Sequence, residues 1–301
     1  MYDIIVIGGG VSGLMAALYA CRASKSVLVI EKETFGGQIT YSPKVENIPG
    51  FIQISGNEYA EKLVEQALEQ GAEMESAVVT EIRDGGDTKT VVTDAGEFVA
   101  RAVIIATGAR HRTLGLEGED ALIGDGISFC AVCDGAFYGG QTVAVIGGGN
   151  SALQEALLLS ETVKKLYVIQ DLDYLTGEAK LAEQLKTKEN AEIICGAHLE
   201  EYLSDENGIT GIKIKLSGGE EREIAVNGVF LAIGLIPQNE PFENVLELTE
   251  RGYADSGEDC RTKTEGVFVA GDCRNKRIRQ VTTAAADGAV AALAACEYID
   301  R

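Results

Sequence analysis

Two cysteines and an aspartate stand together in the stretch CAVCD, as Cys130, Cys133 and Asp134. A cysteine pair with this spacing can close a disulfide or supply half of a zinc site. Zinc would need two further ligands, and the sequence offers no second C-x-x-C pair and only two histidines, His111 and His198. A redox-active disulfide is therefore favoured, because a thiolate exchanges with disulfides and an adjacent acid can handle the proton. Capping of the local turn is the alternative role for Asp134.

The other cysteines do not extend this pair. Seven cysteines are an odd number, and those outside the C-x-x-C pair are scattered along the chain, so they do not form a disulfide framework. Their apolar or turn surroundings favour packing roles. These residues are Cys21, Cys195, Cys260, Cys273 and Cys296.

A glycine-rich turn near the N-terminus has the spacing of a dinucleotide-binding site. The stretch GGGVSG places Gly8, Gly10 and Gly13 in a G-x-G-x-x-G pattern between an apolar strand and a helix. The first glycine permits a tight turn, the second lets the backbone approach a pyrophosphate, and the third allows close packing of helix and strand. Glu31 ends the next strand, at the distance where an acid hydrogen-bonds a ribose hydroxyl. This unit therefore predicts a bound dinucleotide.

Asp272 favours FAD as that dinucleotide. It ends a buried strand in the stretch VAGDC, where an acid can bind a ribityl hydroxyl and the following helix can approach the flavin ring. The return of the C-terminal segment to the first unit points the same way. An ordinary helix N-cap is the alternative role for Asp272.

A second strand–helix–strand unit repeats the pattern as GGGNSA, which has the G-x-G-x-x-A form of a pyridine nucleotide site. An acid follows its second strand at nearly the spacing found in the first unit. A free ribose 2′-hydroxyl prefers an acid at this place, whereas a 2′-phosphate is repelled by it. The residues expected to contact the nucleotide are Gly147, Gly149, Asn150, Ser151, Ala152 and Asp171.

Chain length and this repeat predict two domains. A chain of 301 residues exceeds the usual length of one domain, and the two strands of each unit are expected to join one parallel sheet. The C-terminal segment has no third glycine turn and ends in a helix packed through its alanine face, so it is expected to complete the first domain. The predicted fold is α/β, with two Rossmann-like dinucleotide-binding domains in three ββα layers, the second inserted into the first. The expected FAD-binding domain comprises residues 1–114 and 241–301, and the inserted domain with the C-x-x-C pair comprises residues 115–240.

The composition of the chain argues against two classes of partner. A formal net charge of −21 would repel a nucleic acid backbone over most of the surface. No stretch approaches about 18 uninterrupted apolar residues, so a membrane span is not expected. The first residues, MYDIIVIGGG, lack the basic start of a signal peptide, and a cytoplasmic location is the expectation that follows.

These motifs together resemble the low-molecular-weight thioredoxin reductases, class II of the flavoprotein pyridine nucleotide-disulfide oxidoreductases. The resemblance covers nearly the whole chain, and C-x-x-C-D inside the second nucleotide domain is its most specific part. The matching motifs, in the order of the family, are GGGVSG, GGQITYSPKVENIPGF, ATGA, CAVCDG, VIGGGNSALQEA, VAGDC and RQVTTAAADG.

The resemblance implies that FAD is held by both parts of the first domain. Asn47 would lie near the isoalloxazine ring, Asp272 would bind the ribityl chain, and the RQV triplet would lie at the flavin end. The full implied set is Gly8, Gly10, Ser12, Gly13, Glu31, Gly37, Gln38, Asn47, Thr107, Gly108, Asp272, Arg279, Gln280 and Val281.

The resemblance also implies how the dithiol works. Cys133 would be the sulfur nearer the flavin, Cys130 would exchange with thioredoxin or a thioredoxin-like protein, and Asp134 would be the acid–base. A homodimer is implied as well, together with a rotation between domains that presents the dithiol and the nicotinamide in turn.

The sequence departs from NADPH-dependent members of the family after the second strand of the second unit. Those members carry His-Arg-Arg and a later arginine, whereas this chain has Gln170, Asp171, Leu172 and Thr176. A 2′-phosphate prefers bidentate guanidinium partners, so NADH is expected over NADPH as the electron donor.

Two alternatives to this donor and function stay open. One is reduction by ferredoxin, because ferredoxin-linked members of the family lack the phosphate clasp, and RNKRIR could give such a partner a local basic patch. The intact GGGNSA turn and the acidic chain favour the nucleotide. The other is a redox-inert scaffold that binds zinc or a nucleotide, which a purified protein without flavin absorbance would support.

Overall fold

The contacts in the protein, a computed structural model, divide the chain into two units. Unit 1 comprises Met1–Lys44, Ile48–Arg110 and Ile236–Arg301, and unit 2 comprises Val45–Asn47 and His111–Leu235. Every residue is described except Pro43, which belongs to one of the motifs quoted above, and Asn207.

The main crossings between the units lie earlier than the sequence suggests. They fall after residues 110 and 235 instead of 114 and 240. At the crossings β7 (Ala109–His111) pairs with β16 (Leu235–Pro237), and Arg112 N donates to the carbonyl of Gly234 at 3.0 Å. The two chain segments that connect the units therefore pair as strands, and they include residues that the sequence had placed inside a domain.

Unit 1 is built on a seven-stranded sheet with the order β3-β2-β1-β6-β5-β4, in which β17 also pairs with β6. Strands β1, β2, β3, β6 and β17 pair in parallel, whereas β4 and β5 pair in antiparallel fashion beside β6. Ile4, Ile5 and Val6 of β1 are fully buried, as expected for a parallel strand with both faces covered. The bounds are β1 (Tyr2–Ile7), β2 (Val27–Glu31), β3 (Glu73–Ser76), β4 (Val79–Asp84), β5 (Lys89–Thr93), β6 (Gly96–Ile105) and β17 (Val267–Val269).

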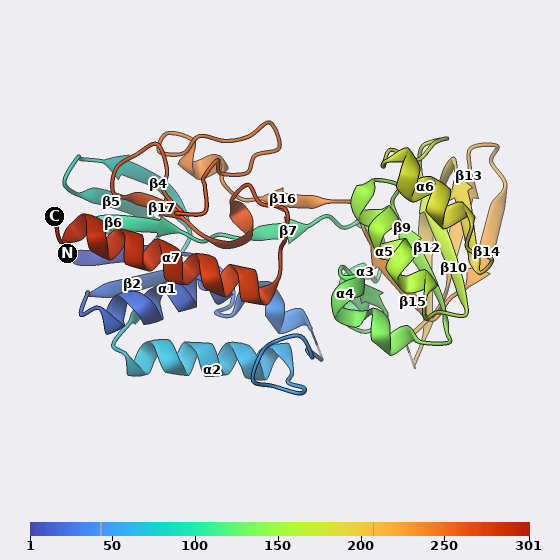
Figure 1. Cartoon of the computed structure of the whole chain (residues 1–301), viewed down its shortest axis with the longest axis horizontal. Helices are drawn as coiled ribbons and strands as arrows, with labels where there is room; N and C mark the ends of the chain where they lie inside the picture. The colour runs from blue at the N-terminus through green and yellow to red at the C-terminus, as the bar shows by residue number, and fades with distance from the viewer. Residues whose placement is uncertain (43, 207) are drawn as a thin grey trace. The chain divides into compact units, whose positions relative to one another are not determined.

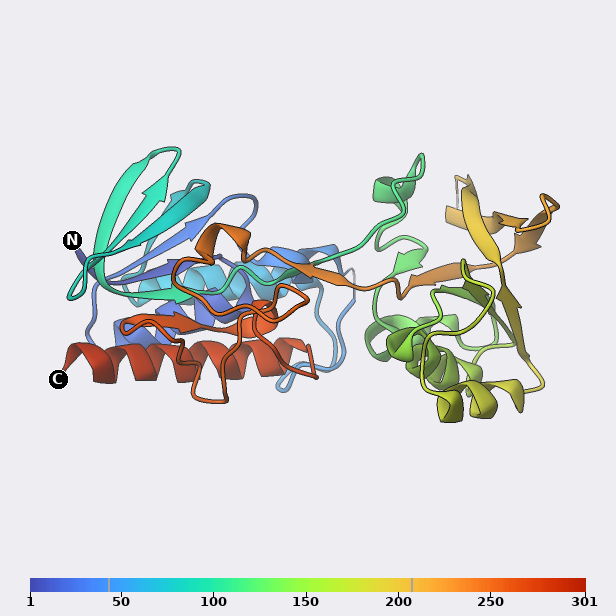
Figure 2. The same cartoon turned by 90° about the horizontal axis from the view of Figure 1, so that it is seen from above.

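In unit 1, α1 packs between α2 and α7, and α1 and α7 contact strands of the sheet (Figures 1 and 2). The alanine face predicted for the C-terminal helix is confirmed, since Ala291, Ala292 and Ala295 are fully buried. At Gly288, an added Cβ would lie 2.2 Å from the carbonyl oxygen of Ser12, so α7 approaches α1 as only a glycine permits. The helices are α1 (Val11–Arg22), α2 (Gly56–Glu69), α7 (Val281–Ile299) and the 3₁₀ turns η1 (Gly37–Tyr41), η3 (Glu240–Phe242) and η4 (Gly271–Cys273).

Unit 2 has three layers. A parallel sheet with the order β11-β10-β9-β15-β8 packs on one face against helices, through a core that includes Leu153, Leu159 and Leu185. Its other face packs against the antiparallel sheet β12-β13-β14. The predicted ββα layering is thus found here (Figures 1 and 2). The strands are β8 (Ile127–Ser128), β9 (Thr142–Ile146), β10 (Lys165–Gln170), β11 (Ala191–Cys195), β12 (Ala197–Asp205), β13 (Gly208–Leu216), β14 (Glu221–Ala225) and β15 (Gly228–Leu231).

The helices of unit 2 place the dithiol and the second glycine turn on the same side of the parallel sheet. They are α3 (Glu119–Leu122), α4 (Ala131–Asp134), η2 (Gly135–Tyr138), α5 (Asn150–Ser160) and α6 (Ala179–Lys186). α5 packs against α4, α6, β9 and β10. Among the helices of the described residues, none combines the length and the hydropathy that crossing a membrane requires.

Candidate active site

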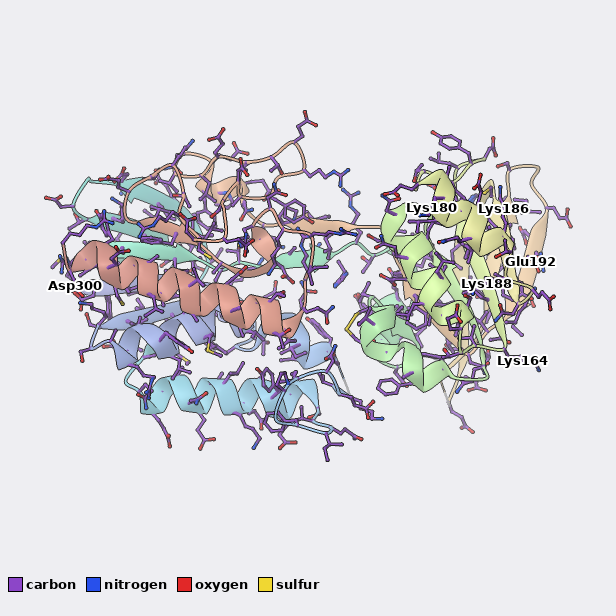
Figure 3. All side chains as sticks on the ribbon, in the orientation of Figure 1. Lys164, Lys180, Lys186, Lys188, Glu192 and Asp300 are labelled. Carbon is purple, nitrogen blue, oxygen red and sulfur yellow. A yellow bond between two sulfur atoms is a disulfide. The ribbon has the colours of Figure 1, made fainter. Side chains whose placement is uncertain are left out.

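The two cysteines of the C-x-x-C motif close a disulfide in unit 2, with their Cα atoms 5.3 Å apart. Figure 3 draws this bond in yellow beside α4. Cys130 caps the helix in an extended backbone conformation, and its Sγ accepts the N–H of Cys133 at 3.2 Å. The short helix thereby orients both sulfur atoms from one turn of backbone.

Asp134 is held beside this disulfide by a serine. Ser128 Oγ donates to Asp134 Oδ2 at 2.6 Å and accepts the N–H of Cys130 at 3.1 Å. Asp134 Oδ1 is buried and has no hydrogen-bond partner. Burial raises the pKa of the Asp134 carboxyl, and the hydrogen bond from Ser128 opposes that shift. Asp134 is thus suited to exchange a proton next to a thiol, and Ser128, two residues before the first cysteine, is a partner that the motif alone did not indicate.

The first glycine turn has the geometry of a dinucleotide site. Gly8 has a φ of +105°, and an added Cβ would lie 2.4 Å from the carbonyl oxygen of Ala106. At Gly13 an added Cβ would lie 1.8 Å from the carbonyl oxygen of Gly8. Gly10 caps α1, whose first turn carries Ser12 with a buried Oγ that has no hydrogen-bond partner. The helix N-terminus and this hydroxyl are available to a phosphate.

Glu31 and the GGQ segment close the same turn. Glu31 Oε2 accepts the N–H of Gly9 at 2.7 Å, so the acid at the end of β2 lies against the glycine turn. At Gly37 an added Cβ would lie 3.0 Å from the Cα of Gly10, and Gln38 donates through Nε2 to the carbonyl of Ala109. These residues therefore lie close together, as the sequence predicted.

Asp272 lies in η4, directly after β17, with its Oδ1 atom buried. Lys276 Nζ lies 3.3 Å from this oxygen as an ion pair, without the geometry of a hydrogen bond. Burial raises the pKa of Asp272, and Lys276 opposes the shift. Arg279 lies next to them, with its guanidinium 4.3 Å from the ring centre of Tyr253 and its Nε donating to the carbonyl of Asp272 at 3.4 Å.

The remaining predicted flavin residues occupy the ends of neighbouring elements. Thr107 and Gly108 follow β6, and Thr107 Oγ1 donates to Asn239 Oδ1 at 3.4 Å. Gln280 caps α7 in a capping box with Thr283. Val281 begins the same helix. Asn47 lies in the connection between η1 and α2, but its contacts assign it to unit 2, so the structure does not group it with the other predicted flavin residues.

Two buried atoms test whether these residues fit FAD. Both are inaccessible to solvent: Ser12 Oγ has no hydrogen-bond partner, and Asp272 Oδ1 has only its ion pair with Lys276, although buried polar groups are nearly always hydrogen-bonded. A phosphate oxygen near the start of α1 and a ribityl hydroxyl near η4 would satisfy them. The donor set in unit 1 therefore fits the cofactor.

Replacing Asp272 with alanine should weaken FAD binding by about 10- to 100-fold, because a hydrogen bond to a charged group contributes about 1.5–3 kcal/mol. Titration of apoprotein with FAD, followed by flavin fluorescence, measures this dissociation constant. Asp255→Ala, which removes an exposed carboxylate from the same unit, is the control and should bind FAD normally. An unchanged dissociation constant in Asp272→Ala would remove Asp272 from the site.

The second glycine turn makes the same hydrogen bond to its neighbouring strand as the first, but the residue at the end of that strand differs. Gly147 N donates to the carbonyl of Ile169 at 2.8 Å, as Gly8 N donates to that of Ile30 at 2.8 Å. The residue that follows Ile169 is Gln170, so Gln170 stands at the position of Glu31.

Asp171 therefore lies one residue beyond the position that its spacing suggested. The parallel with Glu31 is corrected by this strand register. Gln170 is buried against Gly148, where an added Cβ would lie 2.6 Å from the Gln170 amide carbon. Asp171 is exposed at the end of β10, and its Oδ1 accepts the N–H of Leu172 at 2.9 Å.

The segment after β10 returns over the glycine turn without a cationic side chain. Thr176 N and Gly177 N both donate to the carbonyl of Gly148 at 2.9 Å. Gly149 caps α5, and Asn150, Ser151 and Ala152 form its first turn. No lysine or arginine stands between residues 170 and 178, all of which the structure describes.

Comparisons with known proteins agree with this geometry. A family described as pyridine nucleotide-disulphide oxidoreductase matches residues 2–288. The chain is 39% identical to a thioredoxin reductase of Bacillus subtilis (strain 168), over 100% of this chain and 96% of that protein. It is 40% identical to a thioredoxin reductase of Treponema pallidum (strain Nichols), over 99% and 97%. The crystal structure of thioredoxin reductase from Streptococcus pyogenes MGAS5005 superposes with a TM-score of 0.95 at 36% identity, covering 100% of this chain and 98% of that one. The chain belongs to the pyridine nucleotide-disulphide oxidoreductase family, among its low-molecular-weight thioredoxin reductases.

Proposed function

We propose that this protein is a thioredoxin-disulfide reductase in which electrons pass from a donor through FAD to the Cys130–Cys133 disulfide and on to thioredoxin or a thioredoxin-like protein. The observation that carries the proposal is the closed disulfide on α4 with a buried carboxyl group beside it. FAD, when bound, supplies two-electron chemistry that joins the donor to the disulfide. The residues of unit 1 described above would hold and orient it.

The roles proposed for the dithiol residues are those of thiol–disulfide exchange, with the two cysteines in the order that the family resemblance implies. The Cys130 thiolate attacks the disulfide of the substrate protein, forming a mixed disulfide and releasing one substrate thiolate. Asp134, whose pKa is raised by burial, is placed to exchange a proton with that thiolate. The Cys133 thiolate then attacks Cys130 Sγ, which restores the internal disulfide and releases the second substrate thiolate. Ser128 orients Asp134 throughout.

NADH is the donor that the residues of unit 2 support best. The glycine turn and the N-terminus of α5 can receive a pyrophosphate. Gln170, Asp171 and Leu172 supply no positive charge for a 2′-phosphate, and the exposed Asp171 carboxylate would repel it.

Ferredoxin is the second candidate donor. The lack of a phosphate clasp favours it. The basic patch expected at RNKRIR is weakened in the structure, since the buried side chains of Arg274 and Lys276 both pair with Asp287. Unit 2 has exposed lysines that an acidic protein could approach, although the chain as a whole is strongly acidic. Those labelled in Figure 3 are Lys164, Lys180 and Lys186.

Anaerobic reduction of the flavin-loaded protein by NADH, NADPH and reduced ferredoxin, each with oxidised thioredoxin present, tests both proposals. We expect NADH to bleach the flavin and to produce thioredoxin thiols. If reduced ferredoxin alone bleached the flavin, ferredoxin and not a nucleotide would be the donor, and the proposed reduction of thioredoxin would stand. A protein that binds no flavin would refute the proposed function.

A further inference from the structure

Glu155 is a partly buried residue whose carboxyl group the proposed mechanism does not use. It lies on α5, and its Oε2 atom is inaccessible to solvent and has no hydrogen-bond partner. Burial raises the pKa of Glu155 to about 7. A group with these properties exchanges protons near neutral pH.

Glu155 faces the turn that carries the disulfide. The backbone N–H of Ala131, the residue that follows Cys130, interacts with the Glu155 carboxyl group and favours its ionised form. α5 packs against α4. An added Cβ at Gly135, at the end of α4, would lie 3.0 Å from Leu159 Cδ2 of α5. A change of charge on Glu155 therefore reaches α4 through direct packing and one backbone N–H group.

Other charged groups do not account for the properties of Glu155. Its pKa shift arises from burial and from Ala131, with no contribution from another side chain. The elements packed against α5 are α4, α6, β9 and β10, and β9 carries no titratable residue. The titratable residues of the others, with the capping Cys130, are Cys130, Cys133, Asp134, Lys165, Tyr167, Lys180, Glu183 and Lys186.

We propose that Glu155 couples proton uptake to reduction of the Cys130–Cys133 disulfide, acting through the α4 turn. It is a positioning residue, because it touches the backbone between the cysteines and neither the substrate protein nor the sulfur atoms in the contacts above. The proposal rests on the proposed redox role of this disulfide.

The coupling follows from the charge balance of the reaction. Two electrons break the bond between the two Sγ atoms and leave two thiolates, which take up protons from solvent wherever the pH lies below their pKa values. Thiolate charge near Glu155 disfavours ionised Glu155, and ionised Glu155 likewise disfavours the thiolate. The reduced protein therefore retains more protons than the dithiol alone would hold.

The sign of the effect depends on pH. Below the pKa of about 7, Glu155 is protonated in both oxidation states and adds nothing. Above it, where the thiols also begin to ionise, the oxidised protein holds an ionised Glu155, whereas the reduced protein keeps an additional fraction of a proton shared between Glu155 and the thiols. The midpoint potential of the disulfide should thus fall more steeply with pH in this range.

The experiment measures that slope in the full-length protein. The protein is equilibrated anaerobically with dithiothreitol redox buffers over a range of pH, and the two additional thiols of the reduced state are counted by maleimide alkylation. Above about pH 7, in the range where the thiols ionise, the wild-type slope should exceed that of Glu155→Gln by up to about 30 mV per pH unit, the equivalent of one proton in a two-electron couple. Glu155→Asp should restore the steeper slope, and Glu161→Gln, at the exposed end of α5, should behave as wild type.

Each outcome bears on one claim. Equal slopes for the wild type and Glu155→Gln would overturn the role of Glu155. If Glu155→Gln does not fold, Glu155→Met removes the ionisable group at similar volume, and equal slopes there would overturn the role as well. A pair that does not titrate with two electrons in the wild type would instead refute the redox role of the disulfide.

Discussion

Replacement of Cys130 with serine is expected to lower thioredoxin turnover to below about one thousandth of the wild-type rate while leaving reduction of the flavin by its donor intact. Exchange with a substrate disulfide needs a thiolate at this position, and a serine hydroxyl is not ionised near neutral pH. Cys133, the second sulfur, stays in place beside Asp134 but has no partner with which to form the internal disulfide. Thioredoxin-coupled turnover and anaerobic flavin reduction, measured on the same preparation, separate the two half-reactions.

Cys195→Ser is the matched control for this variant. Cys195 is a free, partly buried cysteine at the end of β11 in the same unit. Its replacement should leave both half-reactions at wild-type rates. Full thioredoxin turnover in the Cys130 variant would overturn the assignment of the dithiol.

The double variant Asp171→Arg with Leu172→Arg should shift the preference between NADPH and NADH, as the ratio of kcat/KM values, by roughly 100-fold toward NADPH. The substitutions remove a carboxylate that repels a 2′-phosphate and add two guanidinium groups that can donate to it. Both positions are exposed after β10, so the fold should tolerate the change. Stopped-flow reduction of the flavin by each nucleotide measures the ratio.

Glu220→Arg likewise replaces a carboxylate with a guanidinium group, at an exposed residue before β14 in the same unit, and should leave the ratio unaltered. An equal shift in this control would mean that the net charge of the protein, and not the end of β10, decides the preference. No shift in the double variant would place the nucleotide ribose elsewhere.

Local sequence patterns were sufficient to predict much of the fold and of the candidate site. Each glycine turn lies between an apolar strand and a helix, and all three parts are read from neighbouring residues. The C-x-x-C spacing likewise follows from a single turn of backbone, so a closed disulfide at Cys130 and Cys133 needed no knowledge of distant contacts. The insertion of one domain into another was also predictable, because the C-terminal segment contained no third turn.

The register of the strands could not be predicted from the spacing of residues in the sequence. Gly147 to Asp171 differs by one residue from Gly8 to Glu31, and the sequence cannot show which residue of the second strand pairs with which residue of the first. The ladder between β9 and β10 decides it, and places Gln170 where the first unit has Glu31. The crossings between the units also differ from the predicted bounds, because β7 and β16, which lie at the crossings, pair with each other.

The surroundings of the dithiol depended on tertiary structure in the same way. Ser128 precedes the motif by two residues, and Glu155 follows it by a glycine turn and half a helix. Nothing in their spacing relates them to a disulfide. Packing of α5 on α4 buries one carboxyl oxygen of Glu155 and brings this residue to the backbone between the cysteines. The sequence by itself predicted which atoms react, whereas the packing of distant segments decided which acids lie around them and how far they are buried, because burial is a property of the folded neighbourhood and not of the residue.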